Sequence, residues 1–159
     1  MLRTTDAPGQ PFGAAVDERT MSDASTIDML VDCLGEGDAV ANAAQEALCR
    51  APREAVGKAM LAVLASRVEL RPAALEVLKK LKYYEAIDPL TEIARDKDPG
   101  VHGPALDALA AIADPDDKDL SRLVRLVPLV EGAQRDEVER TIWKVCDKLP
   151  ADADRSQPV

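Results

Sequence analysis

His102 is the only histidine of the 159-residue chain, and acidic side chains follow it in the sequence. Asp114, Asp116 and Asp117 close the apolar run that comes after His102. A histidine near carboxylates could bind a metal ion or transfer protons. Zinc and similar ions need three or four converging ligands, whereas Asp98 and Asp114 bracket a whole predicted helix. We therefore predict that His102 is a surface residue, because it directly follows an apolar anchor and should project away from the core.

Other patterns that support catalysis or cofactor binding are missing from the sequence. It contains no glycine-rich phosphate loop, no G-x-S-x-G motif and no calcium-loop spacing. The aspartates of "DPDDKD" fit the start of a helix, where negative charge is favourable. Cys33, Cys49 and Cys146 lack C-x-x-C spacing and occupy apolar helical positions. We expect buried free thiols, a cytoplasmic protein, no bound metal, no cofactor and no enzymatic activity.

Composition favours an all-helical protein that does not bind nucleic acid. Hydrophobic residues make up 47% of the chain and aromatic residues only 3%. Most of the apolar residues are alanine, leucine and valine, and alanine and leucine are strong helix formers. The formal net charge of −9 opposes binding to phosphate backbones. No apolar run has the length of a membrane span. We expect a single domain over residues 22–149, with flexible tails over residues 1–21 and 150–159.

One apolar pattern recurs along the chain. An anchor residue is followed four, seven and eight positions later by further apolar residues, which is the spacing of one helix face. The anchors recur at intervals of about thirty residues, at Val40, Leu70, Val101 and Val138. Another apolar helix is predicted before each of these, in "STIDMLVDCLG", "PREAVGKAMLAVLAS", "YYEAIDPLTEIARD" and "DLSRLVRLVPLVEG". The sequence therefore predicts an α-α superhelix of about four helical hairpins, whose stacking buries the apolar stripes.

Residues 85–115, "EAIDPLTEIARDKDPGVHGPALDALAAIADP", carry a family resemblance. They resemble a HEAT repeat of the short kind also found in bilin-lyase-like proteins, with Asp98 at the turn and Val101 opening the second helix. The resemblance extends over residues 24–148. It implies a solenoid that binds partners. It also implies kinks at Pro89 and Pro128 in the first helices, because a mid-helix proline removes a hydrogen bond.

One position departs from the family pattern. The arginine that usually follows the anchor is replaced by Ala41, His102 and Glu139, and only Arg71 is retained. We therefore expect the ladder of Asp–Arg contacts between neighbouring turns to be mostly missing. Packing within each repeat would then carry more of the stability.

The predicted function is that of a non-catalytic scaffold for protein–protein interaction. In such solenoids the second helix of each pair usually lines the concave face, where a protein or peptide partner binds. Outward residues of these helices are the candidate contacts, namely Asn42, Gln45, Arg71, Lys79, His102, Asp107, Glu139 and Trp143.

Two alternatives to this function stay open: a bilin-lyase-related or lyase-accessory protein, and a structural subunit of a larger assembly. A phosphate site at the basic and aromatic stretch "LKKLKYYE" is disfavoured by the net charge. Trp143 is predicted either to cap the final helix or to anchor a partner.

Overall fold

A computed structural model of the protein describes residues 24–149. The tails predicted over 1–21 and 150–159 lie outside this range. All regular structure within it is helical: α2 (Ala24–Cys33), α3 (Asp38–Arg50), α4 (Arg53–Ser66), α5 (Arg71–Leu81), α6 (Ile87–Ile93), α7 (Pro99–Ile112), α8 (Asp117–Leu126) and α9 (Ala133–Cys146). Short 3₁₀ helices, η1 (Val68–Leu70), η2 (Tyr84–Ala86) and η3 (Val127–Leu129), adjoin α5, α6 and α8.

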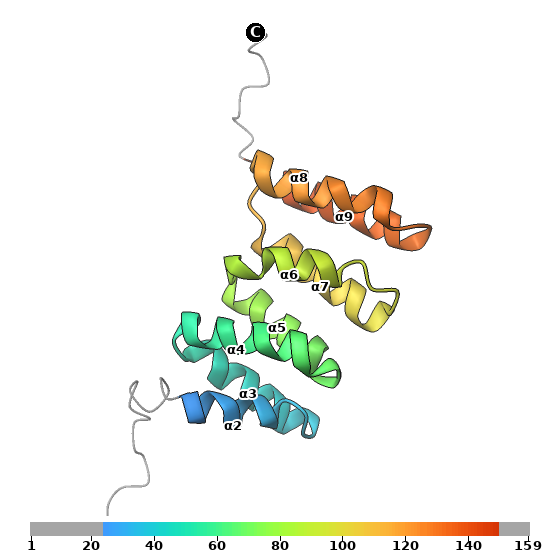
Figure 1. Cartoon of the computed structure of the whole chain (residues 1–159). Helices are drawn as coiled ribbons and strands as arrows, with labels where there is room; N and C mark the ends of the chain where they lie inside the picture. The colour runs from blue at the N-terminus through green and yellow to red at the C-terminus, as the bar shows by residue number, and fades with distance from the viewer. Residues whose placement is uncertain (1–23, 150–159) are drawn as a thin grey trace, which may run out of the picture.

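The helices pack in sequential pairs, and the pairs stack in chain order (Figure 1). α2 contacts α3, α4 contacts α5, α6 contacts α7 and α8 contacts α9. The second members α3, α5, α7 and α9 also contact one another in series and form one layer, while α2, α4, α6 and α8 form the other. This all-helical arrangement is consistent with a helical solenoid, in which each unit touches only its neighbours.

The core follows the predicted stripes most closely in the middle of the stack. Leu70, Ala74, Val77 and Leu78 are all buried, and so are the four corresponding residues of α7. In the outer pairs Ala47, Ile142 and Cys146 are half-buried, and the largest departure is Val40, with 47% of its surface exposed. It belongs to the first pair of the described stack, which has a following neighbour and no preceding one. An apolar residue on the outer side of α3 therefore has nothing to pack against.

Turns and caps set the orientation of α7. Asp98 is its N-cap, and the Asp98 side chain accepts a hydrogen bond from the Gly100 amide at 2.9 Å. Pro99 occupies the first turn, where the missing amide proton is harmless. Asp116 caps α8 in the same way by accepting from the Asp119 amide at 2.7 Å. The acidic turns are thus structural, as the sequence indicates.

The predicted kinks at Pro89 and Pro128 are wrong. Pro89 lies in the first turn of α6, directly after η2, and Pro128 lies within η3. In both places the chain changes between 3₁₀ and α geometry, so neither proline interrupts an established α-helix. The proline inside a helix is instead Pro104 of α7.

A glycine allows the second and third helix pairs to pack closely. Gly57 is buried in α4, and a Cβ atom at this position would lie 2.5 Å from the ring of Tyr83. Tyr83 is only 3% exposed and belongs to the core. The missing side chain at Gly57 therefore makes the space that the aromatic ring fills.

Candidate partner-binding surface

The expectation that His102 is a surface residue is wrong. It is 1% exposed, and its Nδ1 lies 2.6 Å from the carbonyl oxygen of Ala94. Its Nε2 lies 3.2 Å from a carboxylate oxygen of Glu137 on α9, without the geometry of a hydrogen bond. Nδ1 must carry a proton to donate to a carbonyl. The His102 ring therefore links Ala94, at the end of α6 in its own helix pair, to α9 in the next pair.

Arg71 and His102 occupy equivalent positions and make equivalent contacts. The Arg71 Nε donates to the Leu64 carbonyl at 3.0 Å, near the end of α4, and its guanidinium lies 3.8 Å from Asp96 in the next pair. His102 likewise reaches back to Ala94 and forward to Glu137. Of the four positions that follow an anchor, only Arg71 thus makes an Asp–Arg contact with the next pair, as expected, and His102 provides a different link at the equivalent place.

A second polar network joins α6 and η2 to α8. Asp119 is 1% exposed, and its carboxylate accepts from the Tyr84 hydroxyl at 3.1 Å, the Asp114 amide at 3.0 Å and Arg122 at 2.8 Å. Arg122 also pairs with Asp88 at 2.9 Å. Burial, followed by the neighbouring carboxylate of Asp119, raises the pKa of Tyr84. The hydrogen bonds compensate for burying a carboxylate, so this cluster is structural.

The two tyrosines of the basic stretch both make contacts within the protein. Tyr83 is buried against Gly57, and Tyr84 is engaged with Asp119. Burial also raises the pKa of Tyr83. Lys79 pairs with Glu76 at 2.9 Å, and Lys80 contacts the Gln45 side chain at 3.2 Å. The stretch is therefore committed to contacts within the protein.

The cysteines are less buried than the sequence suggests. Cys33, Cys49 and Cys146 are free thiols at half-buried positions. Burial raises the pKa of Cys49, which opposes formation of the reactive thiolate. Among residues 24–149 no group of three metal-ligating side chains is brought together. No helix in this range is long and apolar enough to cross a membrane.

Several predicted contact residues lie on the layer of second helices. Asn42 and Asp107 are exposed, and Gln45 and Lys79 are half-buried. Asp107 pairs with Lys144 across α7 and α9 at 3.3 Å. Glu139 pairs with Arg135 on its own helix at 3.1 Å.

Trp143 is 69% exposed and does not face α7. Successive helical residues turn by about 100°, so Trp143 lies roughly opposite Thr141, the buried residue beside α7. It therefore sits at the open end of the described stack and does not cap the final helix by burial.

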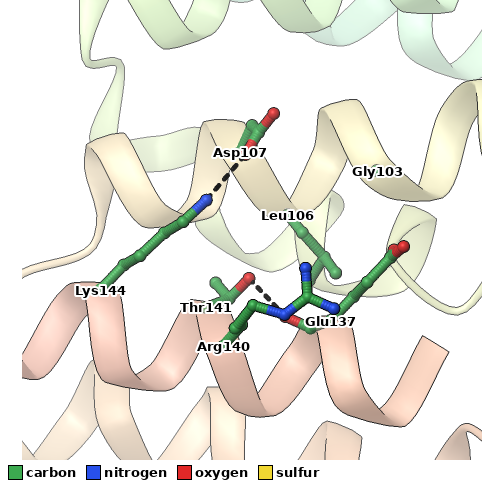
Figure 2. A pocket seen from close by; sticks show the side chains of 7 residues that line it. All are labelled: Gly103, Leu106, Asp107, Glu137, Arg140, Thr141 and Lys144. Atoms are coloured by element: carbon green, nitrogen blue, oxygen red, sulfur yellow. Dashed lines mark hydrogen bonds and ion pairs between the residues drawn. The ribbon is translucent and has the colours of Figure 1, made fainter. Parts of the chain in front are cut away.

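A hollow of about 210 Å³ opens between α7 and α9. Figure 2 shows Lys144 reaching from α9 to Asp107 on α7, with Arg140 and Glu137 extending into the space beside Leu106.

Gly103 leaves the α7 side of the hollow open, since a Cβ there would meet nothing within 4 Å. A glycine is also suited to the position before Pro104, where a side chain would crowd the proline ring. Arg140 and Lys144 were not among the predicted residues, because nothing in the sequence shows which polar side chains border a hollow.

Comparison with known proteins identifies the repeat type. The family model of HEAT repeats matches residues 57–145, more than half of the chain. No curated protein and no solved structure matches. HEAT repeats are generally non-catalytic and commonly serve as scaffolds for protein interaction. The chain belongs to the HEAT-repeat family.

Proposed function

We propose that this protein is a non-catalytic scaffold that binds a protein partner on the layer formed by α3, α5, α7 and α9. In this proposal four HEAT-like hairpins within residues 22–149 make the solenoid, and the second helices form its concave face. The observation that carries the proposal is the hollow between α7 and α9, with the exposed polar side chains around it. The three free cysteines support a reducing compartment such as the cytoplasm.

The proposed surface differs from the one expected from sequence. His102 is buried and Arg71 is held by Leu64 and Asp96, so both stabilise the stack and we remove them from the surface. Arg140 and Lys144 take their place. Trp143 and Glu139 extend the surface toward the end of the stack, where a partner that passes the last helix would meet them.

Site-specific photo-cross-linking in the native host tests this function. A photoreactive residue at Asn42, Asp107 or Arg140 should trap the same protein, and one at Lys58 on α4 should trap none. The purified partner should then bind Arg140→Glu at least about tenfold more weakly, because reversing a charge leaves like charges opposed. Equal trapping from Lys58, or equal binding to Arg140→Glu, would contradict the proposed surface.

A bilin-lyase-related role rests on the repeat pattern of residues 85–115 alone. It predicts a change in visible absorbance when the purified chain is mixed with a bilin. The scaffold predicts no such change. The remaining alternative, a structural subunit, predicts that the purified chain is monodisperse only together with its neighbouring subunits.

A further inference from the structure

A furrow lies between α6 and α8, in the layer opposite the proposed surface. Both helices belong to the layer of first helices (Figure 1). The furrow has a volume of about 210 Å³. Its lining includes Glu92 and Arg95 at the end of α6, and Arg122, Arg125, Leu126 and Leu129 from α8 and η3.

The charged groups that line this furrow are paired, except for Arg125. Three guanidinium groups line it with a single carboxylate, that of Glu92. Arg122 is engaged by Asp88 and Asp119, and Arg95 pairs with Glu92 at 2.9 Å. Arg125 is exposed and makes no hydrogen bond or ion pair with any residue of the described range. Its position in the last turn of α8 suits the helix dipole, which accounts for a positive charge there but not for the neighbouring arginines.

The hollow between α7 and α9 also has an unpaired arginine, but with a carboxylate beside it that no lysine or arginine engages. Arg140 also has no ion-pair partner among the described residues, but Asp107 and Glu137 line the hollow with Arg140 and Lys144. Two carboxylates balance two cations there. Of these two hollows, the furrow is the one whose uncommitted arginine has no uncommitted carboxylate beside it, because Glu92 pairs with Arg95.

Apolar side chains complete the furrow. Leu126 is 1% exposed and forms part of its floor, whereas 55% of Leu129 is exposed. An exposed leucine is ordinary by itself. Leu129 lines the furrow together with Arg125, which has no partner among the described residues. The furrow therefore has an apolar part and a cationic part.

We propose that the furrow between α6 and α8 binds a protein segment in which an aspartate or glutamate stands beside an aliphatic residue. The carboxylate pairs with Arg125, the guanidinium that no described residue engages. The aliphatic side chain packs on Leu129 and Leu126. A free phosphate fits less well, because only one guanidinium is uncommitted and the leucines offer a phosphate nothing.

Nuclear magnetic resonance titration of the full chain tests the proposal with short peptides. The probe is acetyl-Ala-Asp-Leu-Ala-amide, and the matched peptides replace Asp by Asn or Leu by Ala. The probe should shift the Arg125 side-chain and Leu129 methyl resonances and bind at least about threefold more tightly than either matched peptide. No shift at millimolar peptide, equal binding of the Asn peptide, or tighter binding of inorganic phosphate would each overturn the proposal.

Two arginine variants provide the matched control. Arg125→Gln should weaken binding of the probe by the same factor as the Asn peptide, whereas Arg140→Gln should leave it unchanged. Equal effects of the two variants would overturn the assignment to the furrow. This site is independent of the proposed scaffold function, because the partner trapped on the second helices should bind more weakly to Arg140→Glu and equally well to Arg125→Gln.

Discussion

Single buried polar residues decide how neighbouring helix pairs are joined in this protein. His102 shows this most clearly, since its ring contacts Ala94 in one pair and Glu137 in the next. An apolar residue of similar size would fill the same volume and leave the Ala94 carbonyl without this donor.

We expect His102→Ala to lower the free energy of unfolding by about 2–4 kcal/mol, because it opens a cavity and removes a donor from a buried carbonyl. Urea unfolding followed by circular dichroism measures this change. Asp107→Ala is the control, since its exposed pair with Lys144 should contribute less than about 1 kcal/mol. Equal effects of the two substitutions would show that the histidine contacts do not stabilise the stack.

The two tyrosines predict how stability responds to alkaline pH. Burial raises the pKa of both Tyr83 and Tyr84 in the folded protein, so folding favours their neutral forms. Their contribution to stability is fully present below the usual pKa of about 10 and is lost as the pH rises through the folded-state values. Tyrosinate absorbance should therefore titrate at higher pH in the native chain than in urea. Because the chain has only two tyrosines, Tyr84→Phe leaves a signal from Tyr83 alone.

Within single elements, close packing outweighs helix propensity. Gly57 lies inside α4, where alanine would favour the helix by about 0.5–1 kcal/mol in the absence of neighbours. The 2.5 Å approach of a Cβ to the Tyr83 ring reverses this preference.

Gly57→Ala should therefore destabilise the protein by about 1–3 kcal/mol, as overpacking does. In a Tyr83→Ala background the same substitution should become neutral or stabilising, because the ring that opposes the new methyl group is absent. A double-mutant cycle from chemical denaturation measures the coupling. Additive effects of the two substitutions would refute the contact as the cause.

At the scale of the whole molecule, a stack held by contacts between neighbours should lose stability locally. The buried carboxylate of Asp119 joins Tyr84 and Arg122. Removing it leaves the Asp114 amide and the guanidinium without this partner.

Asp119→Ala should destabilise the protein by about 2–4 kcal/mol, because the Tyr84 hydroxyl and the Asp114 amide lose a buried acceptor, while Arg122 keeps its pair with Asp88. Hydrogen exchange should accelerate most in α8 and α9 and least in α2 and α3, since each pair touches only its neighbours. Asp32→Ala, which removes an exposed pair with Arg67, is the control and should have an effect below about 1 kcal/mol. Uniform acceleration along the chain would contradict a stack of locally coupled pairs.

The sequence by itself determined the helices, their pairing and most of the core. The i, i+4, i+7, i+8 stripes of α5 and α7 are buried as predicted, because helical periodicity is a local property of the chain. The caps at Asp98 and Asp116 follow equally from local chemistry. Val40 departs most from this prediction, since its burial depends on a neighbour that the first described pair lacks.

Only the tertiary structure decided which contacts are made by side chains at the edges of the apolar stripes. His102 and Arg71 project from the edge of a stripe, and the position of the next pair determines whether such an edge meets solvent or protein. The hollow beside Arg140 and the furrow beside Arg125 likewise exist only between helices. Periodicity indicates which side of a helix faces the core, but the spacing and angle between packed helices decide what lies along its edges.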